Sequence, residues 1–450
     1  MDITGKKISI LGAVRSGVAA AKLAKTFEGI PFVSDMESKD KIENNIFSLE
    51  SEKIQYETGG HSDKVYDCDF IVTSPGVPSN AAVLLKAKEK GIPVYSELEF
   101  ASWFCKGELI AITGTNGKTT TTALCAFTLN ECGVNASAAG NIGLAFSEIT
   151  ADVKQMEYVA LEVSSFQLDY IKDFKPKFSM ILNITPDHLD RYENNFEKYV
   201  EAKMRITQNQ DGDAFFIYNA DDEDIPKEFG NEEVKKFQFS LKSKIENGSY
   251  FINGKLYFAI NGQAQEVCDS EILSIKGEHN IANALAVLTV AKLLNLPNDK
   301  IASAFKKFPG VEHRLEFVRE INGVQYVNDS KATNVDSVWY ALRSFSKPIY
   351  LILGGRDKGN DYNLIKELCI QNVVKIYAIG ESAQKVFDFF NNLIDVEIKD
   401  SLEACVEAGR AEADPHSILL LSPACASFDM FKDFEHRGNV FKEAVNRLNA

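Results

Sequence analysis

The sequence predicts an α/β protein built on mainly parallel sheets. Short apolar runs are followed by a glycine-bearing turn and then by a helical pattern, and this unit recurs along the chain. It is visible in KISILGAVRSGVAAAKLAK, ELIAITGTNGKTTTTALCAFTL, PIYLILGGRDKG and SILLLSPACASFDMF. Alternating strands and helices are typical of parallel sheets covered by helices. Ligands bind such sheets at the carboxyl ends of the strands, where the unusual polar residues of this chain lie.

Size and composition narrow the class of protein. A chain of 450 residues exceeds one ordinary core and indicates two to four domains. A formal net charge of -15 argues against nucleic acid as a partner, because a phosphate backbone requires a basic surface. No stretch resembles a signal peptide or a membrane span, so we expect a cytoplasmic protein without membrane insertion. The eight cysteines form no C-x-x-C pair, which indicates neither a zinc site nor a disulfide framework.

Two changes in the pattern predict domain boundaries. The first α/β unit gives way to ELEFASWFCKGELIAITG after Ser96, and KKFPGVEHRLEF introduces a new α/β run near Gly310. Residues 211–275 are strand-like and rich in turns, so we expect an antiparallel edge of the middle domain there. The expected domains span residues 1–96, 97–310 and 311–450.

The stretch IAITGTNGKTTTT predicts a phosphate-binding loop between a strand at 108–112 and a helix at 118–131. Its end fits the pattern G-x-x-x-x-G-K-[ST], although Ile112 stands where that pattern has its first glycine. Backbone N–H groups and the helix N-terminus would hold a polyphosphate. Lys118 would reach the β- and γ-phosphates, and the Thr119 hydroxyl would bind Mg²⁺. The alternative, a glycine-rich turn without a ligand, is disfavoured by the preceding strand and by G-K-T-T.

The first glycine turn, GAVRSG from Gly12 to Gly17, is a weaker signal. Val14 stands where G-x-G-x-x-G has its middle glycine. That glycine lets the pyrophosphate of a dinucleotide approach the backbone closely. A nicotinamide cofactor is therefore disfavoured. Binding of another phosphate ligand and a role in packing alone both remain open.

Polar residues at other strand ends suggest a metal and a nucleotide base. Glu162 follows YVAL, and Asp187-His188 follow SMILNIT, so both could face a nucleotide-bound metal. Each alone is more often a capping residue, but the phosphate loop in the same domain favours the metal. Asn280 and Asn283 share a helix face and could read adenine, or simply cap a polar helix start. There is no N-K-x-D motif, so adenine is favoured over guanine.

Three cations in the last third, Arg314, Lys331 and Lys358, follow apolar runs and together suggest an anionic substrate. Any one of them alone would be read as solvated surface.

Together these motifs resemble the ATP-dependent Mur ligases of peptidoglycan synthesis. The form T-G-T-N-G-K-T-T is that family's own phosphate loop, and the resemblance covers nearly the whole chain in order. It implies a Rossmann-like N-terminal domain that binds UDP, a central P-loop ATPase-type α/β domain, and a Rossmann-like C-terminal domain for the incoming amino acid. NDSKATN (Asn328 to Asn334) and SPACASFDMFKDFEHRG (Ser422 to Gly438) resemble the members that add D-glutamate to UDP-N-acetylmuramoyl-L-alanine.

Other functions fit less well. An alanine-adding ligase would show histidine where Asn116 stands, and a diaminopimelate- or lysine-adding ligase carries an asparagine-proline-arginine stretch that is not found. A folylpolyglutamate synthase usually has G-K-G where this chain has Gly117-Lys118-Thr119. A non-catalytic nucleotide-sensing or scaffold protein is disfavoured by the intact Lys118, Glu162, His188 and Lys203.

The resemblance implies that ATP phosphorylates the carboxylate of the muramoyl-L-alanine substrate. The D-glutamate amine then attacks the acyl phosphate, and a tetrahedral intermediate collapses to amide, ADP and phosphate. Because two anions must meet, metal and lysine charge have to offset their repulsion. The catalytic residues implied are Lys118, Glu162, His188, Lys203 and Lys331.

Two Mg²⁺ ions are implied, one at Thr119 and Glu162 and the other at His188 and Lys203. A lysine ammonium only donates hydrogen bonds, and in this family the matching lysine is carbamylated, which makes it a carboxylate. The residues implied in ATP binding are Gly114, Thr115, Asn116, Gly117, Lys118, Thr119, Thr120, Asn280, Asn283, Arg314 and Asp329.

Substrate residues carry over in the same way. Asp35 matches the acidic residue on the uracil side, but Met36 and Glu37 after it do not suit a diphosphate. Arg15 and Ser16 are therefore expected to contact the UDP part instead. The remaining substrate residues implied are Asn141 and His188 at the muramoyl-alanine end, Thr333 and Lys358 at the α-carboxylate of D-glutamate, and Ser427 with the Phe434 backbone at its γ-carboxylate. We expect a monomer whose partners are these small molecules.

Overall fold

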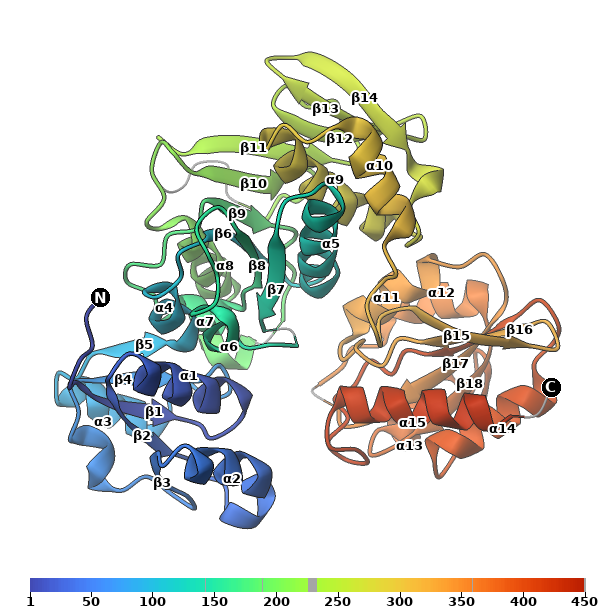
Figure 1. Ribbon diagram of the computed structural model, residues 1–450. Helices are drawn as coiled ribbons and strands as arrows, with labels where there is room; N and C mark the ends of the chain where they lie inside the picture. The colour runs from blue at the N-terminus through green and yellow to red at the C-terminus, as the bar shows by residue number, and fades with distance from the viewer. Residues whose placement is uncertain (142, 188, 226–232, 358, 449–450) are drawn as a thin grey trace. The chain divides into compact units, whose positions relative to one another are not determined.

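The computed structural model describes residues 1–141, 143–187, 189–225, 233–357 and 359–448, and three sheets carry the fold (Figure 1). His188 and Lys358 lie outside the described residues. The chain forms two compact units, Met1–Leu273 with Ile281–Phe308, and Ser274–Asn280 with Pro309–Ala450. The α/β class with mainly parallel sheets is confirmed. The boundaries near residues 96 and 310 remain predictions.

The first sheet has five strands in the order β3-β2-β1-β4-β5, and all of its pairs are parallel. The order reverses between β1 and β4, and ligands bind at such a switch point. Its strands are β1 Lys7–Leu11, β2 Ile30–Ser34, β3 Gln55–Glu57, β4 Phe70–Thr73 and β5 Val94–Ser96. Its helices are α1 Arg15–Thr26, α2 Glu43–Ser51 and α3 Ala82–Glu89, with 3-10 turns at Lys39–Ile42 and Asp63–Tyr66.

The second sheet belongs to the same unit and has nine strands in the order β14-β13-β12-β11-β10-β9-β6-β8-β7. Its strands are β6 Glu108–Thr113, β7 Ala136–Gly140, β8 Tyr158–Glu162, β9 Phe178–Ile181, β10 Phe215–Asn219, β11 Lys235–Ser240, β12 Gly248–Ile252, β13 Lys255–Ile260 and β14 Gln263–Asp269. The helices around it are α4 Glu97–Ser102, α5 Lys118–Glu131, α6 Phe146–Ile149, α7 Ser165–Leu168, α8 Phe196–Met204, α9 Glu278–Leu293 and α10 Asn298–Lys307. Shorter 3-10 turns span Leu189–Tyr192, Arg205–Thr207 and Ser270–Ile272.

The expected antiparallel edge is only partly present. Strands β12, β13 and β14 pair antiparallel, whereas β10, β11 and β12 pair in parallel. The antiparallel pairs are joined by Asn253-Gly254 and Asn261-Gly262, and all four residues have positive φ. Such Asn-Gly turns match the twist of a two-residue hairpin. The parallel strands β10, β11 and β12 are joined by longer connections. The apolar pattern of the strands did not show whether consecutive strands would pair in parallel or form hairpins.

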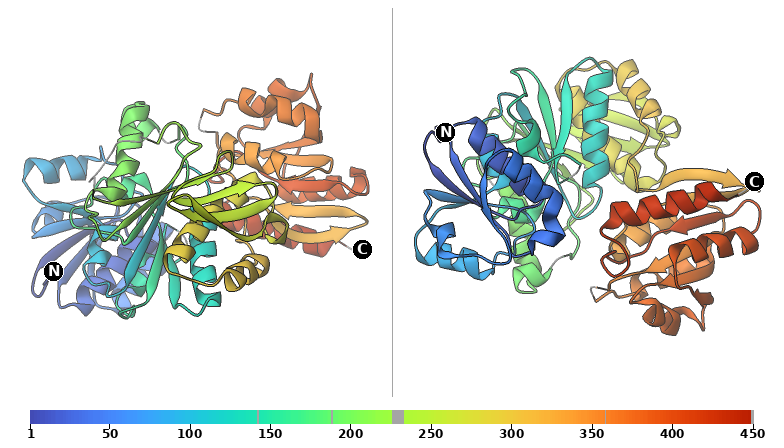
Figure 2. Two further views of the ribbon diagram at one scale, coloured as in Figure 1. Left: turned by 90° about the horizontal axis from the view of Figure 1, so that it is seen from above. Right: turned by 60° about the horizontal axis from the view of Figure 1, so that its bottom comes forward.

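The third sheet lies in the second unit, with the order β15-β16-β20-β17-β18-β19. Its strands are β15 Glu316–Ile321, β16 Val324–Asn328, β17 Ile349–Gly354, β18 Val373–Ile379, β19 Asp395–Ile398 and β20 Ile418–Leu421. Among its described residues β15 and β16 pair antiparallel, and the other strand pairs are parallel. One core lies under α11 Val335–Arg343, α12 Asn363–Asn372 and α13 Ala383–Phe390, and another under α14 Leu402–Glu412 and α15 Phe434–Arg447. Figures 1 and 2 show α15, in red, along one face.

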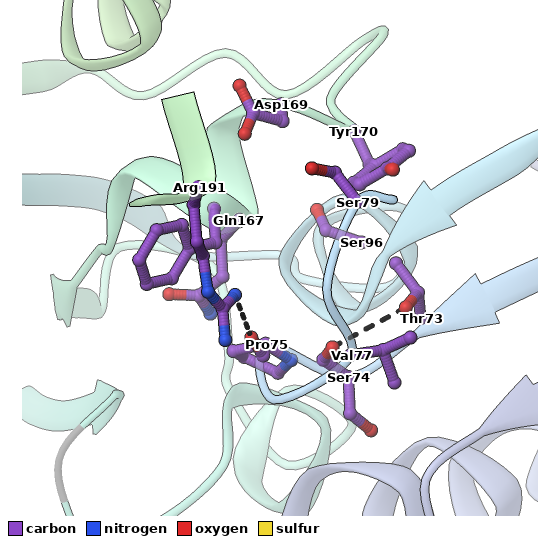
Figure 3. A pocket seen from close by; sticks show the side chains of 11 residues that line it. Thr73, Ser74, Pro75, Val77, Ser79, Ser96, Gln167, Asp169, Tyr170 and Arg191 are labelled. Atoms are coloured by element: carbon purple, nitrogen blue, oxygen red, sulfur yellow. Dashed lines mark hydrogen bonds between the residues drawn. The ribbon is translucent and has the colours of Figure 1, made fainter. Parts of the chain in front are cut away.

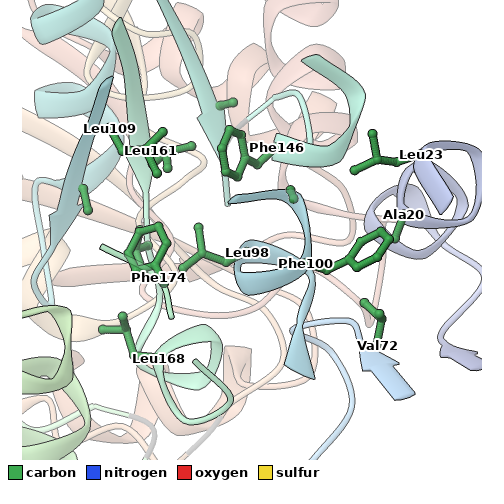
Figure 4. Packing of buried hydrophobic residues seen from close by; sticks show 14 of the residues in the cluster. Ala20, Leu23, Val72, Leu98, Phe100, Leu109, Phe146, Leu161, Leu168 and Phe174 are labelled. Atoms are coloured by element: carbon green, nitrogen blue, oxygen red, sulfur yellow. The ribbon is translucent and has the colours of Figure 1, made fainter. Parts of the chain in front are cut away.

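The first and second sheets share one hydrophobic core. Leu98 and Phe100 of α4 are fully buried in this core, which also contains Val72 of β4 and Phe146 of α6 (Figure 4). The core continues on to Phe174 and other residues around the second sheet. Side chains from both sheets can therefore build one site at a fixed spacing.

A buried carboxylate reinforces this join. Glu99 of α4 is 0% exposed and accepts backbone N–H groups of Lys172 at 2.9 Å, Asp173 at 2.9 Å and Phe174 at 2.8 Å. The indole N–H of Trp103 donates to it at 2.8 Å. Because a buried charge needs such partners, Glu99 ties α4 to the loop before β9.

Each of the eight cysteines is a free thiol. In the part of the chain that the structure describes, no helix is long and apolar enough to cross a membrane.

Replacing Glu99 by glutamine should lower the free energy of unfolding of the first unit by about 3 kcal/mol, because the amide turns N–H donors toward the N–H donors of the loop. Urea unfolding followed by circular dichroism measures the change. Glu108→Gln, at the exposed start of β6, is the matched control and should change stability by less than about 0.5 kcal/mol. Equal stability of the two variants would show that the carboxylate does not hold this join.

Candidate functional site

The phosphate loop has the expected frame, because β6 ends at Thr113 and α5 begins at Lys118. Gly114 has φ of 148° and Gly117 has φ of 85°, a region that favours glycine. A Cβ on Gly117 would lie 2.6 Å from the side-chain oxygen of Asn283 in α9. Two predicted residues of the nucleotide site, Gly117 and Asn283, therefore lie close together.

Asn183, a residue that the sequence reasoning missed, clamps this loop. Its side-chain oxygen accepts the N–H of Asn116 at 2.8 Å, and its amide group donates to the Asn116 carbonyl at 3.1 Å. The hydroxyl of Thr115 donates to the Thr185 carbonyl at 2.9 Å. The available signal was a polar residue shortly after the buried strand β9, which neighbours β6.

Two lysine amines converge on one carbonyl oxygen. The Nζ of Lys118 donates to the Gly114 carbonyl at 2.9 Å and to the Thr115 carbonyl at 2.8 Å. The Nζ of Lys203 donates to the same Gly114 carbonyl at 2.9 Å and lies 4.6 Å from the ring centroid of Tyr199. Lys203 is only 2% exposed. Its burial, and then the charge of Lys118, lower the pKa of Lys203 well below its ordinary value, although Asp187 opposes this.

Glu162 at the end of β8 carries an unused carboxylate oxygen. Its Oε1 accepts the side-chain amide of Asn141 at 3.4 Å, while its buried Oε2 makes no hydrogen bond to any described residue. A buried carboxylate oxygen without a donor is costly unless a cation is bound. Glu162 and the hydroxyl of Thr119, a residue that is 7% exposed, therefore fit an Mg²⁺ ion.

A cage built from the protein alone is not found. Among the described residues, no group of three or more histidine, cysteine, aspartate or glutamate side chains could hold a metal ion.

The predicted UDP residues meet at the glycine turn after β1. Both carboxylate oxygens of Asp35 are used by backbone donors, Oδ2 by Ala13 and Oδ1 by Glu37 at 2.7 Å. The guanidinium of Arg15 donates to the Gly143 carbonyl. Ser16 is half-buried beside it in the sequence. Asp35 therefore shapes the turn that carries Arg15 and Ser16.

A pocket opens at the carboxyl ends of β4 and β5 (Figure 3). The guanidinium of Arg191 donates to the Pro75 carbonyl at 3.1 Å and lies 4.0 Å from the ring centroid of Phe166. The lining residues are Thr73, Ser74, Pro75, Val77, Ser79, Ser96, Phe166, Gln167, Asp169, Tyr170 and Arg191. The sequence reasoning selected none of them, although the turn S-P-G after β4 was a usable signal.

In the second unit Arg314 forms an ion pair with Asp329, and both residues are predicted to bind the nucleotide. Their closest charged atoms are 3.8 Å apart, and Asp329 also accepts the Ser422 hydroxyl at 2.8 Å and the Leu315 N–H at 3.2 Å. Asp329 is 0% exposed. Burial raises the pKa of its carboxyl to about 6, while Arg314 and the hydrogen bonds pull it down.

The residues predicted to bind the incoming amino acid lie on the loops after β16 and β20, two strands that pair in parallel, and at the start of α15. The Nζ of Lys331 lies 5.3 Å from the ring centroid of Phe434, the first residue of α15. Ser427 is buried on the loop after β20, and Thr333 is half-buried on the loop after β16.

Asn280, which is predicted to bind adenine, donates its side-chain amide to the Lys276 carbonyl at 2.8 Å.

Comparison with known proteins gives a consistent result over the whole chain. Residues 7–83 match the MurD N-terminal domain, 112–291 the Mur ligase middle domain, and 313–425 the Mur ligase glutamate ligase domain. A relative named UDP-N-acetylmuramoylalanine–D-glutamate ligase, from Chloroherpeton thalassium, is 43% identical and is covered over 99% of both chains. A relative of the same name from Christiangramia forsetii is also 43% identical, over 99% of this chain and 100% of that one.

Solved structures share the fold at lower identity. UDP-N-acetylmuramate-alanine ligase from Thermotoga maritima superimposes with a TM-score of 0.64 and 20% identity, over 98% of this chain and 99% of that one. Bifunctional folylpolyglutamate synthase/dihydrofolate synthase from Yersinia pestis gives 0.58 and 15% identity, over 82% and 98%.

The matched segments, the fold and the phosphate loop define a Mur ligase, and the chain belongs to that family. Within the family, its full-length relatives at 39–43% identity are UDP-N-acetylmuramoylalanine–D-glutamate ligases. The resemblance predicted from the sequence is thereby confirmed.

Asp329→Asn should remove a pH dependence of stability. The carboxyl pKa rises on folding from 3.8 to about 6, so between about pH 4 and 6 the folded unit keeps a proton that the unfolded chain has released. The free energy of unfolding therefore falls by about 2 kcal/mol as the pH rises through this window, and the neutral amide should abolish that fall. Urea unfolding at several pH values measures it, with exposed Asp400→Asn as control. A slope that Asp329→Asn leaves unchanged would contradict the assignment.

Proposed function

We propose that this chain is an ATP-dependent ligase that joins D-glutamate to UDP-N-acetylmuramoyl-L-alanine through an acyl phosphate. The observation that carries the proposal is the phosphate loop, with two converging lysine amines and the unpaired Glu162 oxygen on the neighbouring strand β8. The names of the full-length relatives supply the two substrates.

The loop from Gly114 to Thr120 would hold the polyphosphate of ATP. Its backbone N–H groups and the N-terminus of α5 favour an anion there. Lys118, which the structure bonds to the loop's own carbonyl groups, would turn to the β- and γ-phosphates. The residues proposed for the rest of ATP are Asn280 and Asn283 for adenine, and Arg314 and Asp329 for ribose and phosphates.

Thr119 and Glu162 would hold one Mg²⁺ ion, and His188 and Lys203 a second. These ions supply charge neutralisation when the phosphate group is transferred. The buried, unpaired oxygen of Glu162 supports the first assignment.

Lys203 would serve as a carbamate. Its lowered pKa favours the neutral amine, whose lone pair can attack CO₂. The new C–N bond forms, a proton leaves the nitrogen, and the carboxylate that results can face a metal as an ammonium group cannot. Burial favours the loss of the ammonium charge, and the neighbouring positive charge of Lys118 disfavours the ammonium and favours the anionic carbamate.

The UDP substrate would lie along the first sheet, with Asp35, Arg15 and Ser16 toward the nucleotide. Asn141 and His188 would face its muramoyl-alanine end. The hydrogen bond from Asn141 to the proposed metal ligand Glu162 supports this direction. The carboxylate that reacts would then meet the γ-phosphate of ATP near the phosphate loop.

D-Glutamate would bind in the second unit. Thr333 and Lys358 would hold its α-carboxylate, and the Ser427 hydroxyl with the Phe434 N–H its γ-carboxylate. Phe434 begins a helix of 14 residues, whose first N–H groups have no partner within the helix and favour an anion. Lys331, beside Phe434, would offset charge on the transferred phosphate.

In the proposed reaction the carboxylate oxygen attacks the γ-phosphorus and ADP leaves. The uncharged amine of D-glutamate then attacks the acyl carbon, loses a proton, and expels phosphate as the amide forms. The protein's main contribution is to align two anions and hold cationic groups around them. A monomer working in the cytoplasm is part of the same proposal.

The direct test is phosphate release with ATP, Mg²⁺ and UDP-N-acetylmuramoyl-L-alanine, with and without D-glutamate, with the product checked by mass spectrometry. We expect release that depends on D-glutamate and a product heavier by one glutamyl residue. Lys118→Ala should reduce turnover by at least about a thousandfold, because the lysine offsets phosphate charge.

Two results would contradict the proposal. Turnover only with L-glutamate and a pterin acceptor would indicate a folylpolyglutamate synthase. Nucleotide binding without phosphate release on any of these substrates would indicate a sensing or scaffold protein.

A further inference from the structure

A guanidinium group is buried beneath the proposed amino-acid site. Arg437, in the first turns of α15, is 1% exposed and is among the largest fully buried side chains. Burial lowers the pKa of this guanidinium to about 10, so it remains charged at neutral pH. Within the described residues it forms no ion pair, and it donates hydrogen bonds to hydroxyl and carbonyl oxygens.

The hydrogen bonds of Arg437 reach two different loops. Its Nη2 donates to the Ser330 carbonyl at 2.7 Å, and its Nε donates to the Ser330 hydroxyl at 2.9 Å. Its Nη1 donates to the Cys425 carbonyl at 3.0 Å. Ser330 follows β16 and Cys425 follows β20. The Ser330 hydroxyl in turn donates to the Phe434 carbonyl at 2.8 Å, which adds the start of α15 to the same network.

Each anchor of this network adjoins a residue proposed to contact substrate. Ser330 directly precedes Lys331, and Cys425 lies two residues before Ser427. Phe434 itself is the proposed N–H donor to the γ-carboxylate. The distance of Lys331 from Ser427 and Phe434 therefore depends on the loops that Arg437 connects.

We propose that Arg437 is a positioning residue that fixes Lys331 and Ser427 relative to each other and so sets the affinity for D-glutamate. A planar guanidinium holds several acceptors in a rigid fork, which a lysine ammonium cannot reproduce. Nothing in the family comparison or the sequence motifs assigns this role. The inference rests on the proposed ligase function.

Arg437→Lys tests the role because it keeps the charge and removes the fork. The Michaelis constant for D-glutamate should rise about ten- to a hundredfold, as expected when hydrogen bonds to a charged group are misaligned. The Michaelis constants for ATP and for the UDP substrate should stay within about twofold. Arg319→Lys is the matched control, because Arg319 of β15 also donates to a backbone carbonyl, that of Leu448, at 3.2 Å. Its kinetics should match those of the wild type.

A double-mutant cycle with Ser427→Ala separates positioning from general packing. If Arg437 acts by placing Ser427, then Ser427→Ala should raise the Michaelis constant for D-glutamate strongly alone and by less than about threefold in the Arg437→Lys background. If the double variant raises the Michaelis constant for D-glutamate by the full product of the two single effects, the proposal is overturned. A change of all three Michaelis constants together would also overturn it, because it would show a packing role.

If Arg437→Lys does not fold, Ser330→Ala provides the second variant, since it removes the Arg437 bond at 2.9 Å and the bond to Phe434 at 2.8 Å. A folded Ser330→Ala chain should show a raised Michaelis constant for D-glutamate, and an unchanged value would overturn the inference. The wild-type assay distinguishes the two proposals. No ligation by the wild type overturns the proposed function and this inference together, whereas ligation with unaffected variants overturns this inference alone.

Discussion

The loop between β6 and α5 is held by two lysine amines that donate to one carbonyl oxygen. Lys118 and Lys203 each donate to the Gly114 carbonyl at 2.9 Å, and Lys203 is buried whereas Lys118 is half-buried. Two full positive charges so close together would repel strongly in a buried setting. The arrangement is stable if Lys203 gives up its proton, and it is suited to phosphate anions that Lys118 can turn to meet. The left-handed glycines and the Asn183 clamp fix the carbonyl at this point.

The shared core explains how residues far apart in the sequence can serve one substrate. The glycine turn after β1, which we propose contacts UDP, lies in one compact unit with the pocket at Arg191 and the phosphate loop, and α4 packs in their shared core. The Glu99 carboxylate accepts three consecutive backbone N–H groups and so prevents α4 from sliding on the loop before β9. In the second unit a guanidinium, that of Arg437, has the corresponding role of joining loops at strand ends.

The sequence predicted the parts of the site that lie in short continuous motifs. The phosphate loop could be identified because strand, glycines, Lys118 and helix follow one another directly. Contacts made through the fold could not: Asn183 and Arg437 act on loops from other strands, and no local pattern marks either of them as buried. Similarly, Asn-Gly turns marked the hairpins of the middle sheet, but nothing local showed that β10 and β11 would pair in parallel. Lys203 was selected only through the family resemblance, since its lowered pKa arises from tertiary burial.

The most direct test of this account is whether Lys203 carries a carbamate. The chain, supplied with ¹³C-bicarbonate, would be examined by ¹³C NMR alongside Lys203→Ala and Lys198→Ala. Lys198 is the matched control because it lies exposed on the same helix and pairs with Glu193 at 2.6 Å. We predict a carbamate resonance in the wild type and in Lys198→Ala that is absent from Lys203→Ala. Wild-type chain that ligates D-glutamate while showing no carbamate resonance at saturating bicarbonate would contradict the account.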